Sequence, residues 1–345
     1  MLRRILPLLT AALILGEEKA AAQDIHFSQF YETTILRNPA LTGIFTDDYR
    51  VSANYRNQWS SISQPFVTGQ VCFETKMKVN RDLSDFFSFG LQANYDKAGT
   101  VQMKTLSVYP SVSYNKSLED GHHSFLSVGF TGGFVQRSID MSKASVNNQY
   151  GPGGFDPYAG TGENLNNNQI THFDLGAGIS FSSGGGEYNQ TTYFVGASAY
   201  HLTKPKQSFY GNEQVRLQMR YNLNAGLTYR FDEYFGLMMQ GNYMMQGSYT
   251  EIIGGGLFHW KRPQESSSDP QFVVYGGAFY RVNDAIIPVI KLDYMRYSFG
   301  FSYDVNVSEL KAASGMKGGY ELSVVKTGMF RESNRGRTVC PHFFY

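Results

Sequence analysis

The residues of this sequence best suited to chemistry are its seven histidines, and their spacing limits what they can do. No two of them stand four residues apart on an expected helix, the spacing at which a helix presents two metal ligands on one face. The adjacent His122 and His123 lie in an expected turn, where solvated side chains are typical. The sequence therefore predicts no metal site.

One histidine leaves a catalytic alternative open. His172 and Asp174 are two residues apart, so an extended strand carries both side chains on the same face. Outer-membrane hydrolases use such a pair together with a serine nucleophile. However, no Gly-x-Ser-x-Gly elbow marks a serine, and the glycine clusters lack the strand-to-helix context of a phosphate-binding loop. We therefore predict no catalytic residue and no cofactor, and keep the hydrolase only as an alternative.

The elements that would position these residues are long alternating segments. From Leu217 to Tyr229 every odd-numbered residue is apolar, and every even-numbered residue is polar or glycine. A β-strand puts these two sets on opposite faces, whereas a helix scatters both around its circumference. The same test predicts about fourteen strands along the chain, at 49–59, 65–77, 86–95, 105–114, 123–136, 171–182, 190–200, 217–229, 234–245, 249–259, 273–280, 286–295, 297–306 and 319–327.

The length of these strands indicates a membrane protein. Most have about 10 residues, as a tilted strand needs to cross the hydrocarbon layer, whereas strands of soluble domains typically have about 5–6. Aromatic residues make up 15% of the chain and charged residues 17%, while the mean hydropathy is −0.32. An open sheet edge in lipid would leave backbone groups unpaired. We therefore predict an all-β fold, a closed transmembrane antiparallel β-barrel in a bacterial outer membrane.

The two ends of the chain fall outside the alternation. Basic Arg3 and Arg4, an apolar stretch at 5–16 and the alanines at 20–22 are typical of a signal peptide. We predict a signal peptide over 1–22, a periplasmic or plug segment over 23–48, the barrel over 49–327 and a periplasmic C-terminal tail over 328–345. An even strand count then puts the longest connection, 137–170, outside the cell.

Net charge and cysteine content exclude further classes. The net charge of +1 and the absence of a basic run argue against a nucleic-acid partner. Only two cysteines occur, so a disulfide framework does not hold this fold together. A bridge between Cys72 and Cys340 is disfavoured because Cys72 lies within an expected strand.

Short motifs along the mature chain resemble a known family. Near its start are Asp-Ile-His-Phe-Ser-Gln-Phe at 24–30, Asn-Pro-Ala-Leu-Thr-Gly at 38–43 and Asn-Tyr-Arg-Asn-Gln-Trp at 54–59. Later come Asp-Lys-Ala-Gly at 96–99, Gly-Gly-Tyr-Glu-Leu at 318–322 and Cys-Pro-His-Phe at 340–343. In this order they resemble the PorP/SprF family, outer-membrane proteins of the type IX secretion and gliding motility system of Bacteroidetes. His342 departs from the arginine expected there.

The resemblance implies a non-enzymatic part of type IX secretion that supports export or surface attachment of large adhesin-type cargo. Its partners would be secretion machinery in the periplasm and outer membrane, the cargo and the lipid bilayer. The Asn38-Pro39-Ala40 motif is also similar to the luminal segment of FadL-type transporters, which favours a plug and leaves a channel or hydrophobic-solute transporter as the alternative. From the motifs and the long loop we predict these partner-binding residues: Asn38, Pro39, Gly43, Asn54, Tyr55, Arg56, Gln58, Trp59, Tyr150, Phe155 and Tyr158.

Overall fold

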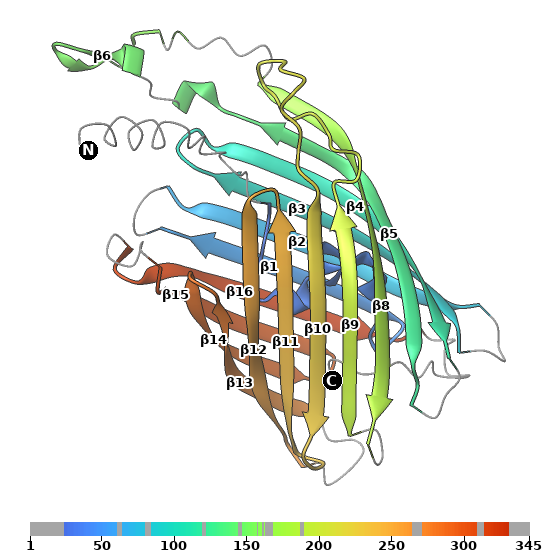
Figure 1. The fold of residues 1–345 in the computed structure, drawn as a ribbon. Helices are drawn as coiled ribbons and strands as arrows, with labels where there is room; N and C mark the ends of the chain where they lie inside the picture. Colours follow the sequence, from blue (N-terminus) through green and yellow to red (C-terminus); the bar gives the residue numbers. More distant parts are fainter. Residues whose placement is uncertain are drawn as a thin grey trace, which may run out of the picture.

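The chain folds, in the computed structural model, into a closed antiparallel barrel of fourteen strands (Figure 1). Each strand of the wall pairs with the next one, and β1 pairs with β16 to close the ring. The predicted fold class and strand number are confirmed. The structure describes residues 24–60, 64–79, 84–118, 122–143, 147–156, 158–160, 162, 168–186, 190–263, 271–308 and 314–330.

The strands of the wall are about as long as predicted, and two further short strands lie in a loop. The wall consists of β1 (Tyr49–Gln58), β2 (Phe66–Lys78), β3 (Phe86–Ala98), β4 (Met103–Ser117), β5 (Phe125–Ser138), β8 (Gln169–Gly185), β9 (Thr191–Tyr200), β10 (Arg220–Arg230), β11 (Phe235–Gln246), β12 (Tyr249–Lys261), β13 (Phe272–Arg281), β14 (Ala285–Tyr294), β15 (Tyr297–Asn306) and β16 (Lys317–Gly328). The loop strands are β6 (Tyr150–Gly151) and β7 (Gly154–Phe155).

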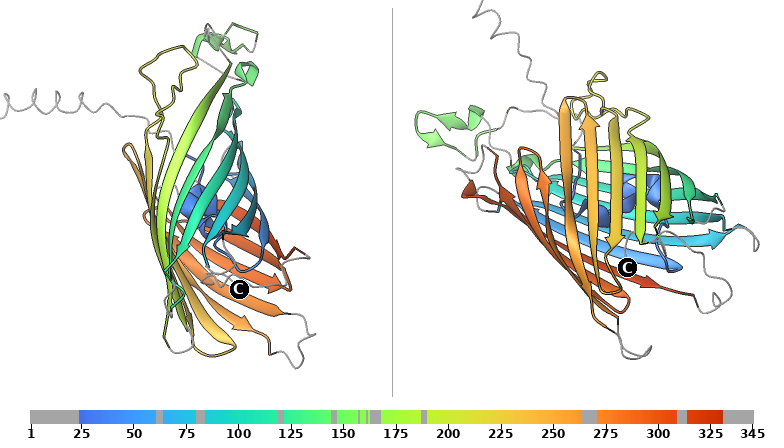
Figure 2. Two further views of the ribbon diagram at one scale, coloured as in Figure 1. Left: turned by 90° about the vertical axis from the view of Figure 1, so that its right-hand side faces the viewer. Right: turned by 60° about the horizontal axis from the view of Figure 1, so that its bottom comes forward.

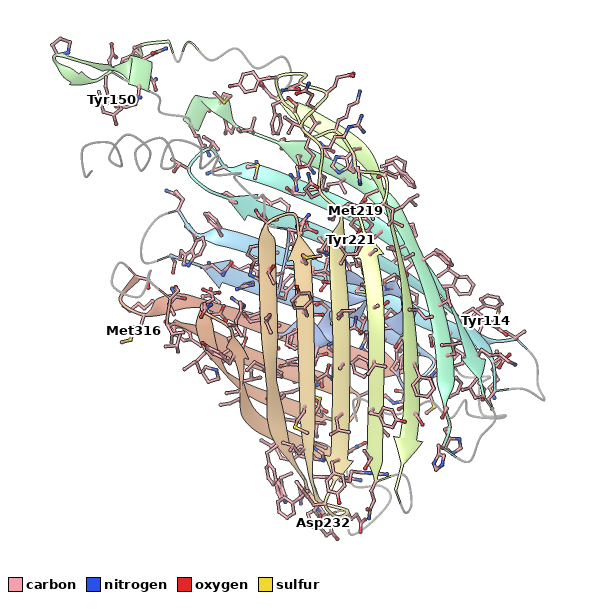
Figure 3. The ribbon with its side chains drawn as sticks, viewed as in Figure 1. Tyr114, Tyr150, Met219, Tyr221, Asp232 and Met316 are labelled. Carbon is pink, nitrogen blue, oxygen red and sulfur yellow. The ribbon has the colours of Figure 1, made fainter. Side chains whose placement is uncertain are left out.

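Alternation along each strand separates a lipid-facing surface from a luminal one. In β14 the side chains of Ile287 and Val289 are buried inside the barrel, whereas Ile286 and Ile290 are exposed on its outer surface. Figure 3 shows outward-facing Tyr221 near the upper end of the wall and Asp232 in a turn at the opposite end. No helix within the described ranges is both long and apolar enough to cross a membrane.

The long connections gather at one end of the barrel, which we call the outer end. They are residues 139–168, which include β6 and β7, and residues 201–219 between β9 and β10 (Figure 1). Opposite them, β10 and β11 are joined through 231–234 only. The strand predicted at 217–229 begins later, at Arg220. The backbone N–H of Leu217 donates to the carbonyl of Pro205 in the preceding connection, and the side chain of Leu217 is buried at the mouth of the lumen.

Residues 27–45 lie inside the barrel, and we call them the luminal segment. They include η2 (Phe30–Glu32), α2 (Thr34–Arg37) and η3 (Pro39–Leu41), the blue turns enclosed by the strands in both views of Figure 2. Every residue of the segment is buried except half-buried Leu36. The turns are short. At the start of η3, Asn38 Oδ1 accepts a hydrogen bond from the backbone N–H of Ala40, and Pro39 is the first residue of the turn.

The predicted domain boundaries remain predictions at both ends. The signal peptide over 1–22 lies outside the described residues, as do 331–345 of the C-terminal tail. Cys72 is a buried free thiol in β2. Cys340, with which a bridge is disfavoured from the sequence, lies outside the described residues as well.

Candidate functional site

The chain passes through the lumen from the outer end to the opposite end. Asp24 is bonded at the outer end to His201 and Arg220, which follow β9 and begin β10. At the other end Lys76 of β2 donates to the carbonyl of Phe45, four residues before β1 begins. The luminal segment between these points contacts strands on several sides of the wall, so it spans the cross-section.

One side of the luminal segment is held by carboxylates of β15 and β16. The two oxygens of Glu321 accept from the backbone N–H groups of Ser28 and Gln29, at 2.7 and 2.9 Å. Asp304 accepts from the Ser28 hydroxyl at 2.6 Å and pairs with Arg56 of β1 at 2.9 Å. All of these side chains are buried. These two backbone donors therefore have a charged acceptor, and such hydrogen bonds are the stronger ones.

Two buried ion pairs hold the same segment further along. Lys291 of β14 donates to Glu32 at 2.7 Å, and both side chains are almost inaccessible. Arg50 Nε of β1 donates to Glu74 of β2 at 2.8 Å, and Glu74 also accepts from the backbone of Gly43 at 3.1 Å. Gly43 has φ +76°, and a Cβ there would collide with the side chain of Ser88. Glycine at this position thus permits the close approach that brings its N–H to Glu74.

The opposite side of the segment is anchored to β8, β9 and β11 through hydrogen bonds of polar side chains. Asn38 Nδ2 donates to the carbonyl of Ile179 at 3.1 Å, and Arg37 Nη1 donates to Gln240 at 2.8 Å. Ser198 donates to the carbonyl of Arg37 at 2.8 Å. The Asn-Pro-Ala motif therefore caps η3 with one atom of its amide and binds the wall with the other.

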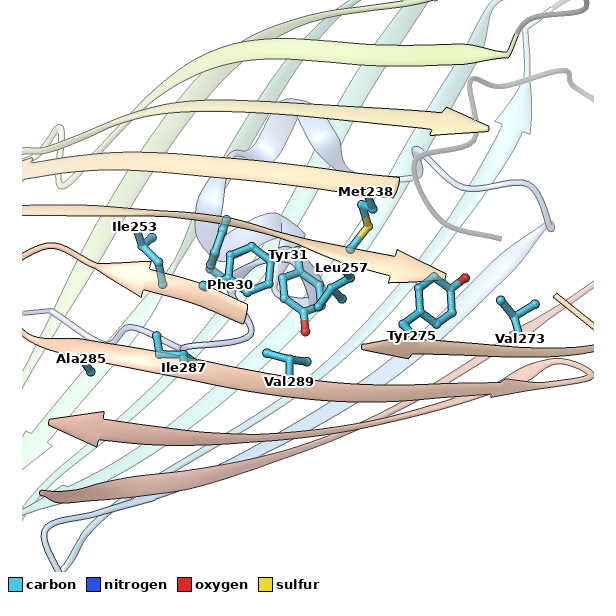
Figure 4. Packing of buried hydrophobic residues seen from close by; sticks show 11 residues of the cluster. Phe30, Tyr31, Met238, Ile253, Leu257, Val273, Tyr275, Ala285, Ile287 and Val289 are labelled. Carbon is cyan, nitrogen blue, oxygen red and sulfur yellow. The ribbon is translucent and has the colours of Figure 1, made fainter. Parts of the chain in front are cut away.

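A patch of the inner wall on β11 to β14 is apolar, unlike the usual polar lumen of a barrel. Phe30 and Tyr31 pack there against Phe279, with ring centroids 5.4 and 5.3 Å apart. Figure 4 shows Phe30 and Tyr31 between Ile253, Leu257 and the β14 side chains. Full burial of such a side chain contributes about 1.5–3 kcal/mol. We call this set the apolar cluster, and its members are Phe30, Tyr31, Met238, Ile253, Leu257, Val273, Tyr275, Phe279, Ala285, Ile287 and Val289.

At the outer mouth of the lumen, His201 links two carboxylates. Its Nδ1 lies 2.8 Å from Asp174 and its Nε2 lies 3.0 Å from Asp24, while Arg220 donates to Asp24 at 2.6 Å. His201 directly follows β9 with φ +59°, a left-handed conformation that histidine tolerates better than most residues. Burial lowers the pKa of His201, but the Asp24 and Asp174 carboxylates raise it more, so the net shift is upward.

The predicted pair His172 and Asp174 shares a face of β8 but does not form a hydrogen bond between described atoms. Asp174 instead accepts from Tyr109 at 2.9 Å and bonds to His201. Both ring nitrogens of His172 are buried without a hydrogen-bond partner in the described part of the chain. A serine protease-like arrangement needs the acid to orient the histidine, so the geometry gives the hydrolase alternative no support.

The predicted partner-binding residues separate into three places, and their role in binding stays a prediction. Asn38, Pro39 and Gly43 belong to the luminal segment. In β1, Asn54 and Arg56 are buried in the lumen and Tyr55 is exposed on the lipid-facing surface. Gln58 is the last residue of β1, and Trp59 follows it. Tyr150, Phe155 and Tyr158 lie in the connection between β5 and β8, which we call the outer loop, and are all exposed.

Several residues that hold the luminal segment were missed from the sequence. Glu74, Lys291 and Glu321 are charged side chains at inward positions of otherwise regular alternating strands. That position is the signal available in the sequence, because a lumen-facing charge in the middle of a strand requires a partner. The sequence does not indicate which residue the partner is. For Lys291 the partner is Glu32 of the luminal segment, more than 200 residues away in the sequence.

Comparison with known proteins identifies the family. Among solved structures, the chain is similar to CdiB from Acinetobacter baumannii (9% identity, TM-score 0.39), covering 81% of this chain and 60% of CdiB. It is also similar to a mutant of the monoaromatic hydrocarbon channel TodX (9%, 0.48, covering 86% and 94%) and to a FadL homologue of Pseudomonas aeruginosa (11%, 0.42, covering 84% and 92%). No curated protein matches the chain.

The family comparison covers nearly the whole barrel. The sequence profile described as "Type IX secretion system membrane protein PorP/SprF" matches residues 19–325. This range runs from before the luminal segment to the last barrel strand, β16. With the closed barrel, it assigns the protein to the outer membrane and confirms the resemblance found from the motifs. The chain belongs to the PorP/SprF family of type IX secretion system membrane proteins.

Proposed function

We propose that this protein is a non-enzymatic component of type IX secretion that supports the export or surface attachment of large adhesin-type cargo. The observation that carries the proposal is the luminal segment, which fills the cross-section of the barrel with buried contacts. A barrel occupied in this way offers surfaces rather than a passage. Cargo and machinery would then bind its loops and exposed ends.

The outer loop is the surface best suited to a protein partner. Tyr150 and Phe155 face each other across the β6–β7 pair, with ring centroids 5.2 Å apart, and Tyr158 is 96% exposed. Figure 3 shows Tyr150 standing away from the wall. Exposed aromatic side chains are typical anchors of protein interfaces. We propose that these three residues contact the cargo or a neighbouring secretion protein.

A channel or hydrophobic-solute transporter is the alternative, and the luminal segment disfavours it. The cavity at the outer mouth is lined by polar side chains such as Asn94 and by apolar ones such as Val135, and beyond it the buried luminal segment occupies the lumen. The purified full chain in a planar bilayer tests this alternative. Our proposal predicts no steady ion conductance, and a stable open conductance would favour the channel.

The secretion role is tested by removing the gene and comparing surface and secreted proteins by mass spectrometry. We expect one or a few large surface proteins to disappear, and re-expression of the natural chain to restore them. The triple variant Tyr150→Ser, Phe155→Ser and Tyr158→Ser should reach the outer membrane in normal amounts but fail to restore them. Unchanged proteomes after deletion would contradict the proposal as a whole, whereas full rescue by the triple variant would reject only the loop.

A further inference from the structure

A cavity at the outer mouth of the lumen has a lining that fits a ligand. It holds about 510 Å³ of empty space continuous with solvent. Asp24 and Ile25 contribute to it from the chain just before the luminal segment, and Ile35 and Leu36 contribute from the segment itself. Side chains of β3, β4, β5, β8, β9, β10 and the 201–219 connection form the remainder. A ligand site needs a few polar groups that fix the orientation of the ligand.

The polar groups of this cavity have more free donors than free acceptors. The Nε atoms of Arg137 and Arg220 and both ring nitrogens of His172 are buried without a hydrogen-bond partner in the described ranges. A neutral imidazole carries one N–H, so three N–H groups lack an acceptor. Among the same lining residues, one acceptor, Oε1 of Gln92, is likewise unpartnered. Buried donors without acceptors cost free energy, and an acceptor-rich ligand removes that cost.

Arg137 is the cation of the cavity that is not neutralised by a direct partner. Its Nη1 donates to the amide of Gln207 at 2.6 Å, and it forms no ion pair with any described carboxylate. Arg220, in contrast, pairs with Asp24 at 2.6 Å. The nearby acidic side chains already have other partners: Asp24 bonds to Arg220 and His201, Asp174 to His201 and Tyr109, and Asp96 to Thr68.

We propose that this cavity binds a carboxylate group, held by the guanidinium of Arg137 and the N–H of His172. A guanidinium presents parallel N–H donors that match the two oxygens of a carboxylate. One unpaired cation among three acidic side chains favours a singly charged group over a doubly charged phosphate, because each added negative charge meets repulsion. The carboxylate can belong to a polypeptide or to a small free acid. This site goes beyond the proposed function and does not depend on it.

Calorimetric titration of the purified full chain in detergent micelles tests the ligand chemistry. The probes are N-acetyl-trialanine with a free C-terminal carboxylate, the same peptide as its C-terminal amide, sodium acetate and inorganic phosphate. We expect the acid peptide to bind about tenfold or more tightly than its amide, as for loss of a hydrogen bond to a charged group. Equal binding of acid and amide, tighter binding of phosphate than of every carboxylate, or no binding of any probe would overturn the proposal.

The same titration separates the two sources of the carboxylate. If the acid peptide binds more tightly than acetate, the site recognises a polypeptide. If acetate binds as tightly as the peptide, the site recognises the carboxylate alone, as a free acid would supply it. Both results support a carboxylate site. Neither depends on whether deleting the gene alters secretion, so failure here and failure of the secretion role are distinguishable.

Variants then assign the binding to the named residues. Arg137→Gln and His172→Gln should each weaken binding of the acid peptide by about tenfold, and Arg216→Gln, an exposed arginine of the 201–219 connection, should leave it unchanged. His172 makes no hydrogen bond to another described residue, so its variant tests the site even if Arg137→Gln folds poorly. Unaltered binding in His172→Gln and in any folded Arg137→Gln protein would contradict the assignment.

Discussion

Two sides of the luminal segment are held to the barrel in different ways. Towards β11 to β14, Phe30 and Tyr31 pack into the apolar cluster. Towards β1, β2, β15 and β16, the segment is held by the carboxylates of Glu74, Asp304 and Glu321. Apolar burial is non-directional and stabilises roughly in proportion to area, whereas charged hydrogen bonds require defined geometry. We infer that the apolar side supplies much of the attachment energy and that the polar side fixes the position of the chain.

The largest effect is expected on the polar side, from Glu74→Ala. This change leaves Arg50 buried without its carboxylate and removes the acceptor of Gly43. Loss of one partner of a buried pair costs about 3–5 kcal/mol, to be measured as the free energy of unfolding in urea in lipid vesicles. Glu213→Ala is the control, because Glu213 and its partner Lys206 are exposed and such pairs contribute about 0–1 kcal/mol. Equal effects would show that burial of the Arg50 pair is unimportant.

Next is Leu257→Ala on the apolar side, which should lower the free energy of unfolding by about 2–5 kcal/mol by leaving a cavity beside Tyr31. Phe258→Ala, one residue along β12, is the matched control. Its side chain faces outward and is 46% exposed, so lipid chains fill the space that it leaves. If Phe258→Ala is the more destabilising of the two, the apolar cluster is not what holds the segment.

A smaller effect is expected from Asn38→Ala, which removes the cap of η3 and the bonds of Asn38 to β8 and β9. Loss of a cap costs about 0.5–2 kcal/mol. Asn38→Ser keeps a cap acceptor for the backbone of Ala40 but loses the amide donor to the wall, so it should fall between the natural chain and Asn38→Ala. Urea unfolding of the three proteins measures the order, and an alanine variant as stable as the natural chain would rule out the anchoring role.

The smallest effect concerns pH at the outer mouth. Asp24 and Asp174 raise the pKa of His201 in the folded protein. Protonation of His201 therefore stabilises the folded state at low pH. This stabilisation is lost as the pH rises from about 6.5, the ordinary pKa of histidine, through the raised pKa of the folded state. The stability advantage of the natural chain over His201→Gln should therefore decrease as pH rises over this range. An advantage that grows with pH would mean that the imidazole is neutral in the folded protein.

The wall of the barrel was predictable because its pattern is local. Alternation over ten or more residues, as in 217–229 and 297–306, predicts the number of strands, and the interval between expected strands predicts the long connection at 137–170. Strand ends were less accurate. Leu217 and Met219 continue the alternation of β10, although the hydrogen bonding of that strand begins at Arg220. An apolar side chain that is buried at the mouth of the lumen produces the same sequence pattern as one in a paired strand.

The candidate site was not predictable in the same way, because it depends on contacts between distant residues. The Asn-Pro-Ala motif indicates the luminal segment, but the partners of that segment on β8, β9 and β16 lie 141 to 294 residues away in the sequence. His172 and Asp174 were correctly expected to share one face of a strand. Their spacing contained no information on His201 and Tyr109, which bond to Asp174 instead.

A disulfide cross-link between the luminal segment and the wall tests the central claim most directly. The hydroxyls of Thr42 and Ser111 of β4 are 3.0 Å apart and buried. In a chain with Cys72→Ser and Cys340→Ser, the pair Thr42→Cys and Ser111→Cys should form a disulfide under mild oxidation, seen as a mass decrease of about 2 Da from the two lost hydrogens. The single variant Thr42→Cys should remain a free thiol, slow to react with maleimide. Two free thiols that react rapidly with maleimide in the oxidised double variant would contradict a segment packed inside the barrel.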